Sequence, residues 1–325
     1  MKRPTATALL LALVCTSASA QTVSPKPSGD QPPSSDLQSP APRFRSAVDL
    51  VSVAAVVRDR KGRFVRNLRK EDFVVEERGV RRDLIDLRAD DNAPVRVALL
   101  FDVSGSMQLA SRLEDARSAA RQVLSALRLA DATDEAAVFS FDMNLQSLQP
   151  FTADAGAIER ALARVAPYGQ TSLYDAIALT ASDVNDSRPG DPRRRAVIVF
   201  TDGVDTSSTL TAQRVAEIAG GIDVPVYVMT VVSSVDRESG SASELAEGPL
   251  RDLSRATGGD LFVTSAPAHE SIAARQIVDE MRHQYLMSFE AAPGAGWHGL
   301  SVKTRDKDFV VRARSGYRAG AHTGS

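Results

Sequence analysis

The sequence predicts an α/β fold: a doubly wound, mostly parallel sheet with one antiparallel edge strand, joined to a small β module built from N- and C-terminal segments. Two observations support this prediction. Between residues 94 and 283, short β-branched apolar runs alternate with stretches that repeat apolar residues at helical spacing. Such alternation is typical of strand–helix–strand units with parallel strands. On both sides of this range the pattern indicates strands only.

The first 20 residues have the pattern of a secretory signal peptide. Lys2 and Arg3 precede an apolar stretch, and Ala18 and Ala20 fit the small-x-small rule for cleavage. We therefore expect cleavage after Ala20 and an exported protein, either periplasmic or extracellular. The apolar stretch is shorter than the roughly 20 residues that a spanning helix needs, so we expect no stable membrane insertion.

Composition excludes several kinds of site. The net charge is −2 and aromatic residues are only 5% of the chain, so no nucleic-acid partner is expected. Cys15 is the only cysteine and lies in the predicted signal peptide. The mature chain would therefore have no disulfide and no thiolate metal site. A lipoprotein anchored at Cys15 is the alternative, but Val14 stands where a small residue is expected.

Two segments precede the alternating region. Residues 21–45 are rich in proline and serine and have too little apolar surface to offset the entropy of ordering, so we expect a disordered linker. Residues 46–93 predict strands, with a hairpin that turns at Arg78–Gly79. Arginines and acids are interleaved along this segment, which is typical of solvated strand faces; an anionic-ligand patch is the alternative.

Residues 94–283 contain the predicted parallel sheet. Its strands are predicted from the apolar runs VRVALLF, AAVFSF, AVIVF and VPVYVMTVV. Helices are predicted near residues 113–127, 158–165, 173–180, 212–219, 244–256 and 272–283. The segment LQSLQPF follows the preceding strand too closely for a crossover helix. It is therefore predicted to be an antiparallel edge strand after a hairpin around Asp142–Leu145.

After His283 the helical pattern ends. Residues 284–318 predict further strands, with a hairpin that turns at Asp306–Asp308. Because these strands are similar in character to those of residues 46–93, we expect the two segments to form one β module, with the 94–283 domain inserted between them. Residues 319–325 are predicted to be a disordered tail.

Carboxylate and hydroxyl side chains follow the predicted strands. The stretch DVSGS, which supplies Asp102, Ser104 and Ser106, follows VRVALLF, and Asp202 follows AVIVF. Thr171 lies just before a predicted helix. Because open α/β sheets bind ligands at the carboxyl ends of their strands, we expect these five residues to meet at that edge.

The five side chains supply two carboxylates and three hydroxyls, all hard oxygen donors. Mg²⁺ prefers six such oxygens and keeps some of them as water; Mn²⁺ and Ca²⁺ are the alternatives. Two carboxylates balance a divalent cation, and the neutral hydroxyls leave it electrophilic toward one more oxygen. We therefore expect a metal site whose shell is completed by an Asp or Glu carboxylate from a partner protein.

At these residues the sequence resembles the von Willebrand factor A domain family, over about residues 94–283. DVSGS, Thr171 and the Thr-Asp-Gly turn at Asp202 occur in the order of that family's metal-ion-dependent adhesion site. The resemblance implies that the three hydroxyls touch the ion and that the two carboxylates act directly or through water. It also implies protein binding without catalysis. The flanking segments resemble, more loosely, secreted bacterial proteins related to this family.

Each site residue taken alone also has a structural explanation. Thr171 before a helix is commonly an N-cap, and Asp202-Gly203 is commonly a turn. Their joint occurrence in three loops favours the metal site. Asp205 is either a solvated loop acid, which we favour, or a partner of the site residues. Asp175 lies in a first helical turn, where the helix dipole favours it.

Catalytic functions are disfavoured. The chain lacks the phosphate-loop motif and the Gly-x-Ser-x-Gly elbow of serine hydrolases. Its four histidines lie in the last fifth of the chain, outside the predicted loops at the sheet edge. A phosphoryl-accepting role for Asp102 is weakened because Ser104 stands where a second acid is expected. A structural domain whose metal only stabilises loops is the other alternative to protein binding, and a metal-dependent hydrolase is a less favoured one. The sequence does not indicate an oligomeric state.

Overall fold

The computed structural model describes residues 50–90, 92–166, 169–186, 192–231, 248–264 and 266–320. All of these ranges fall within one compact unit, Ala47–Ser325. The predicted signal peptide and linker lie outside the described residues, as do residues 244–247 of one predicted helix and residues 321–325 of the predicted tail. No helix within the described ranges is both long and apolar enough to cross a membrane.

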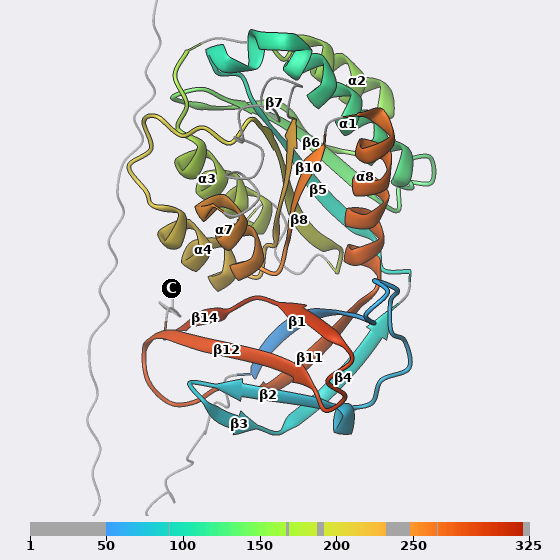
Figure 1. The fold of residues 1–325 in the computed structure, drawn as a ribbon, viewed down its shortest axis with the longest axis vertical. Coiled ribbons are helices and arrows are strands. Elements are labelled where there is room, and N and C mark those ends of the chain that lie inside the picture. Colours follow the sequence, from blue (N-terminus) through green and yellow to red (C-terminus); the bar gives the residue numbers. More distant parts are fainter. Residues whose placement is uncertain are drawn as a thin grey trace, which may run out of the picture. The chain divides into compact units, whose positions relative to one another are not determined.

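A six-stranded sheet forms the centre of the α/β region, in the order β10-β9-β8-β5-β6-β7 (Figure 1). Its strands are β5 (Val95–Asp102), β6 (Glu135–Phe141), β7 (Leu145–Thr152), β8 (Arg194–Thr201), β9 (Val226–Val231) and β10 (Leu261–Thr264). Neighbours pair in parallel except β6 and β7, which are antiparallel. The predicted mostly parallel sheet and its antiparallel edge strand are therefore confirmed.

Helices cover both faces of this sheet. They are α1 (Arg112–Ala126), α2 (Ala155–Arg164), α3 (Leu173–Asp186), α4 (Ala212–Gly221), α7 (Pro249–Ala256) and α8 (Pro267–Arg282). One apolar core lies between the sheet and α1, α2 and α8, and a second lies between the sheet and α3, α4 and α7 (Figure 1). Strand β5 is buried at every position, as a central strand between two covered faces requires.

Helix α8 begins at Pro267, five residues before the predicted start. Proline suits the first helical position because its fixed φ matches the helix and its missing amide hydrogen would have no partner there. The first turn of α8 contains Glu270 and lacks the apolar repeat on which the prediction depended.

The N- and C-terminal segments form two four-stranded sheets, β13-β1-β11-β4 and β14-β12-β2-β3. Their strands are β1 (Leu50–Arg58), β2 (Phe73–Glu77), β3 (Val80–Arg82), β4 (Leu84–Asp90), β11 (Gln284–Glu290), β12 (Gly296–Thr304), β13 (Val310–Ala313) and β14 (Gly316–Ala319), with a short 3₁₀ helix, η1 (Lys70–Asp72), before β2. Strand β11 lies between β1 and β4, and β12 pairs with β2. A third apolar core fills this β module, so the module predicted from both ends of the chain is confirmed.

The hairpin predicted around Asp306–Asp308 is wrong in its pairing. The chain turns there, but β12 pairs with β2 and β14, whereas β13 pairs with β1 in the other sheet. Local residues specify the turn, while the partners of each strand depend on apolar faces more than 200 residues away in sequence. Strand β14 also includes Ala319, which the sequence assigned to the tail.

Buried charges connect the β module to the α/β region. The side chain of Glu280 on α8 is fully buried and forms ion pairs with Arg58, at 2.9 Å, and with Arg312. The buried Arg314 donates a hydrogen bond to the Gly220 carbonyl at 2.7 Å. Removing one partner from such a pair leaves an uncompensated buried charge, so these contacts hold the two parts in one arrangement.

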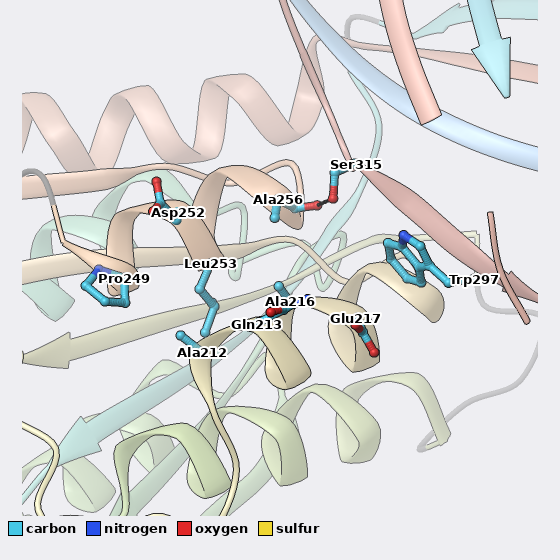
Figure 2. Close-up of a pocket in the computed structure, with 10 residues that line it drawn as sticks. All are labelled: Ala212, Gln213, Ala216, Glu217, Pro249, Asp252, Leu253, Ala256, Trp297 and Ser315. Carbon is cyan, nitrogen blue, oxygen red and sulfur yellow. Dashed lines mark hydrogen bonds between the residues drawn. The ribbon is translucent and has the colours of Figure 1, made fainter. Parts of the chain in front are cut away.

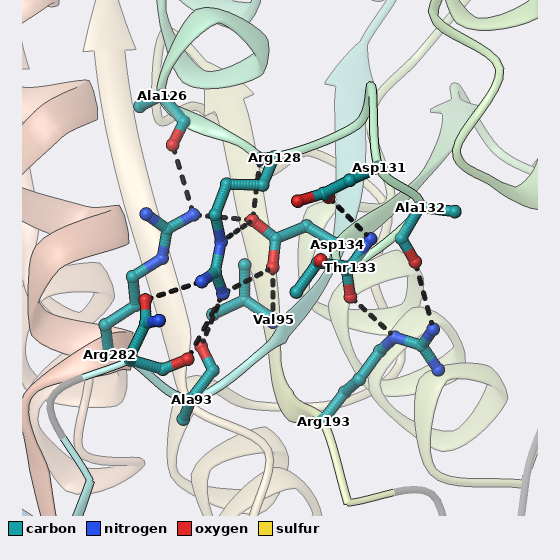
Figure 3. A network of polar contacts seen from close by, with 11 residues as sticks. Ala93, Val95, Ala126, Arg128, Asp131, Ala132, Thr133, Asp134, Arg193 and Arg282 are labelled. Atoms are coloured by element: carbon teal, nitrogen blue, oxygen red, sulfur yellow. Dashed lines mark hydrogen bonds and ion pairs between the residues drawn. The ribbon is translucent and has the colours of Figure 1, made fainter.

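A second cluster of charges lies at the edge of the sheet where β5 and β6 begin (Figure 3). The buried carboxylate of Asp134 accepts hydrogen bonds from the backbone amides of Val95, at 2.9 Å, and Arg128, at 2.7 Å, and pairs with the side chains of Arg128 and Arg282. Burial by itself raises the pKa of Asp134, but the two amides and the guanidinium groups hold that pKa below its usual value. The cluster therefore connects β5, β6 and α8 and serves the fold.

Candidate metal centre

The predicted site residues lie at the opposite edge of the sheet, where β5, β6 and β8 end. Strands β5 and β8 are parallel neighbours with Phe101 paired to Phe200, so Asp102 lies beside Thr201 and Asp202 follows one residue later. The amide of Val103 donates to the Phe141 carbonyl at 3.0 Å, which ties the end of β5 to the end of β6.

The DVSGS stretch leads from β5 into the 3₁₀ helix η2 (Gly105–Ser111). The Asp102 carboxylate accepts a hydrogen bond from the Ser104 amide at 2.9 Å. The Ser104 and Ser106 hydroxyl oxygens lie 3.0 Å apart. Asp102 and Ser104 are buried and Ser106 is half-buried. Three of the five predicted ligands therefore form one compact group of oxygens.

The loop that carries Thr171 contacts the DVSGS stretch through the backbone of Gly169. The Gly105 amide donates to the Gly169 carbonyl at 3.2 Å. Gly169 has φ +93°, and a Cβ there would lie 3.2 Å from the side chain of Asp142, so the position favours glycine on two grounds. Thr171 itself is buried, and its amide donates to the Thr206 hydroxyl at 3.0 Å.

Thr171 is not the N-cap of α3. The first amides of that helix are satisfied by the loop after β8: Leu173 donates to the Asp205 carboxylate at 2.9 Å and Tyr174 to the Ser208 hydroxyl at 3.0 Å. The structural alternative for Thr171 is therefore wrong. The preference for Asp205 as a solvated loop acid is also wrong, because its carboxylate caps α3.

Two residues to which the sequence analysis gave no role of their own contact the predicted ligands. The Thr201 hydroxyl donates to the second Asp102 oxygen at 2.6 Å. Arg112, the first residue of α1, donates to the Asp202 carboxylate at 2.9 Å and to the Ser106 carbonyl at 3.1 Å. Thr201 adjoins Asp202 and could have been found from the motif. Arg112 carries no local signal, because its partner lies 90 residues away.

Asp102 is a buried carboxylate whose partners among the described residues are neutral donors. Burial raises its pKa to about 6, the nearby Asp202 carboxylate contributes to the rise, and the hydrogen bonds from Thr201 and Ser104 oppose it. Within the described ranges, no lysine, arginine or histidine forms an ion pair with Asp102. A bound divalent cation would offset this burial cost, and the carboxylate and hydroxyl donors suit Mg²⁺ or a similar hard ion. The residues present therefore fit the implied metal.

Other metal-binding or catalytic groups are few around this edge in the part of the chain that the structure describes. The described residues contain no group of three or more His, Cys, Asp and Glu side chains that could hold a metal by themselves. His269 lies in the first turn of α8, just after β10, and so nearer this edge than the sequence suggested. However, β10 is three strands from β5 in the sheet. His298 lies in the β module beside Glu77.

A separate cavity of about 320 Å³ lies between α4 and α7 (Figure 2). Its lining is mostly small and apolar, with Trp297 at one end. Two of its polar side chains already have partners: Glu217 pairs with Arg214 at 2.8 Å, and the Ser315 hydroxyl donates to the Ala256 carbonyl at 3.1 Å. This cavity could therefore hold an apolar group but has few polar groups that would bind a specific ligand. The edge of the sheet where β5 and β8 end is the better candidate site.

Comparison with known proteins finds a family match in this part of the chain. The family model of the von Willebrand factor type A domain matches residues 97–204, a range that includes all five predicted ligands. A search of curated proteins finds no match.

Solved structures with a similar fold come from bacteria and from an animal. The conserved hypothetical protein BatB from Bacteroides thetaiotaomicron is 21% identical, with 57% of this chain and 98% of that chain covered and a TM-score of 0.46. An aerotolerance-related membrane protein from Bacteroides fragilis is 20% identical, with the same coverage and a TM-score of 0.47. Proximal thread matrix protein 1 of the mussel byssus, in a structure with a zinc-occupied MIDAS motif, is 13% identical, with 59% and 49% covered and a TM-score of 0.47.

Proposed function

Since this chain contains a von Willebrand factor type A domain, we propose that the domain is a metal-dependent protein-binding module. It binds one divalent cation, Mg²⁺ or alternatively Mn²⁺ or Ca²⁺, at the edge where β5 and β8 end. An Asp or Glu of a partner protein then coordinates the ion. The protein acts after export, in the periplasm or outside the cell, and performs no catalysis.

The observation that carries the proposal is the buried Asp102 carboxylate, which has hydroxyl and amide partners but no cationic one within the part of the chain that the structure describes. A structural role alone does not explain such a group, because an isolated buried carboxylate is costly. The neighbouring Ser104 and Ser106 hydroxyls are acceptors without charge, so they add ligands without over-neutralising a divalent ion.

In this proposal the five predicted residues have separate tasks. Ser104, Ser106 and Thr171 offer hydroxyl oxygens, and Asp102 and Asp202 offer the charge. The bound metal supplies a Lewis-acidic position open to an outside carboxylate. The hydrogen bonds from Thr201 and from the Ser104 amide orient Asp102, as partners of metal ligands commonly do.

Calorimetric titration with MgCl₂ and MnCl₂ tests the metal site. The wild type should bind one ion per chain, and Asp102→Asn should lose that binding because it removes one charge at nearly constant volume. Ser104→Ala and Thr171→Ala should each weaken binding without changing the charge. Asp183→Asn, on the exposed face of α3, is the matched control and should bind as the wild type does. Absence of binding at millimolar metal, or equal binding by Asp102→Asn, would refute the proposal.

A further inference from the structure

We infer that an apolar rim formed by Leu109, Met143 and Val204 surrounds the metal centre, and that it selects partner segments in which an Asp or Glu is flanked by large apolar side chains. This inference rests on the proposed function, because the acidic residue needs the metal. It specifies the residues of the partner that flank the acidic residue and contact the protein, not the metal.

The three rim residues are unusually exposed for their type. Leu109 is 60% exposed, Met143 59% and Val204 49%. Single exposed apolar residues are common on protein surfaces, but groups of them mark interaction sites. Here three large apolar side chains come from three different loops at one edge of one sheet.

Each rim residue is tied to a predicted ligand. Leu109 lies in η2, three residues after Ser106. Val204 follows Asp202 by two residues, and its amide contacts that carboxylate at 3.4 Å.

Met143 lies in the turn between β6 and β7. The preceding residue, Asp142, accepts a hydrogen bond through its carbonyl from the Ser172 amide at 2.8 Å, directly after Thr171. The three rim residues therefore lie in the same segments as the predicted ligands or in segments bonded to them.

An open cavity of about 580 Å³ lies along η2, the element that also carries Leu109. Gln108 and Ser111 of η2 line it. Much of its wall is apolar, contributed by Met107, Leu113, Ala163, Val165 and Ala166, and Glu114 and Arg117 add one charge of each sign. A large side chain of a partner segment has room there.

The charges around the centre favour a single carboxylate. Asp102 and Asp202 carry two negative charges, Arg112 carries one positive charge beside Asp202, and a divalent ion adds two. The loaded site would then have one net positive charge. Apolar side chains that exclude water around this charge strengthen its attraction for a carboxylate, because the effective dielectric constant falls. The expected occupant is therefore one acidic residue within an apolar segment, and a polyacidic segment fits less well.

A peptide array tests this inference on the full-length protein in the presence of Mg²⁺. The probes are immobilised nine-residue peptides with a central Asp, flanked either by Leu or Phe or by Ser, and the same peptides with a central Asn. The protein should capture the apolar Asp peptides at least tenfold better than the Ser-flanked ones. It should not capture the Asn peptides, and EDTA should abolish capture.

The rim variant Leu109→Ser/Met143→Ser/Val204→Ser should bind Mg²⁺ with wild-type affinity and lose the preference for apolar flanks. A control variant with serines at Val80, Ile85 and Val310, which are exposed residues of the β module, should keep it. If Asp peptides are captured equally whatever their flanks, or if the rim variant keeps the preference, the inference is wrong and the proposed function stands. If the wild type binds Mg²⁺ but captures no Asp peptide, the inference is likewise wrong. Failure to bind Mg²⁺ at all contradicts the proposed function itself.

Discussion

Arg112 donates a hydrogen bond to the carboxylate of Asp202, with 2.9 Å between the guanidinium nitrogen and the carboxylate oxygen. Both side chains are largely buried. Asp202 is one of the two carboxylates that the proposal gives to the metal, and it already has a cationic partner, whereas Asp102 has none among the described residues. The proposed metal centre would therefore be asymmetric: an incoming cation would gain the full charge of Asp102 but share that of Asp202.

Replacing Arg112 with glutamine should tighten metal binding. The positive charge opposes a second cation nearby, and at about 4 Å in a partly solvated site such repulsion amounts to roughly 1–4 kcal/mol, or about fivefold or more in affinity. Calorimetry with MgCl₂ measures the change. Arg121→Gln, on the exposed part of the same helix, should have no effect. Weaker binding by Arg112→Gln would mean that the arginine orients Asp202 and does not compete with the metal.

Removing the Thr201 hydroxyl should weaken the metal site without altering its charge. Thr201→Val keeps the shape of the side chain but leaves one Asp102 oxygen without its donor, so metal affinity should fall about tenfold to a hundredfold. Thr201→Ser restores the hydroxyl and should recover most of the affinity. Titrations of Mn²⁺ followed by electron paramagnetic resonance distinguish the three proteins. Equal affinities for the valine and serine variants would exclude a role for this hydrogen bond.

The Asp134 cluster predicts how stability depends on pH. The pKa of Asp134 is lower in the folded protein than its ordinary value of 3.8, so the ionised form stabilises the fold. This contribution is complete above about pH 4 and is lost as the pH falls through the lower folded pKa. Asp134→Asn should cost about 3 kcal/mol at pH 7, because it leaves two arginines without their partner.

Urea unfolding between pH 7 and pH 3 measures this dependence. The difference in stability between the wild type and Asp134→Asn should be constant down to about pH 4 and then narrow. A difference that stays constant down to pH 3 would show that another group accounts for the acid sensitivity.

Because β1 and β11 belong to one β module, a substitution that destabilises the C-terminal strands should also destabilise the N-terminal strands. Phe289 of β11 is fully buried and pairs with Val51 of β1. Phe289→Ala should cost about 3–5 kcal/mol and speed amide hydrogen exchange in β1, which is over 200 residues earlier. Val310→Ala, at a position 63% exposed on β13, should leave that exchange unchanged. Unchanged protection of β1 in Phe289→Ala would indicate that the two segments are stable independently.

The sequence by itself determined most of the helices and strands of the α/β region, and the ends of the strands at which the candidate residues lie. Strand β5 is predicted from a continuous apolar run because both of its faces are covered, and this signal lies within eight residues. Because parallel strands end at one edge of the sheet, the positions of Asp102 and Asp202 after two such strands were enough to bring them together. Metal binding there stays a prediction.

The tertiary structure alone decided which distant groups meet. Strand β13 turns back after β12 but pairs with β1, since pairing depends on the apolar face that needs covering and not on proximity along the chain. Arg112 pairs with Asp202 and Asp205 caps α3, although neither relationship has a local pattern. Helical and strand periodicities are properties of short windows of sequence. Charge pairing and shared surfaces depend on three-dimensional distance, which only the packed fold sets.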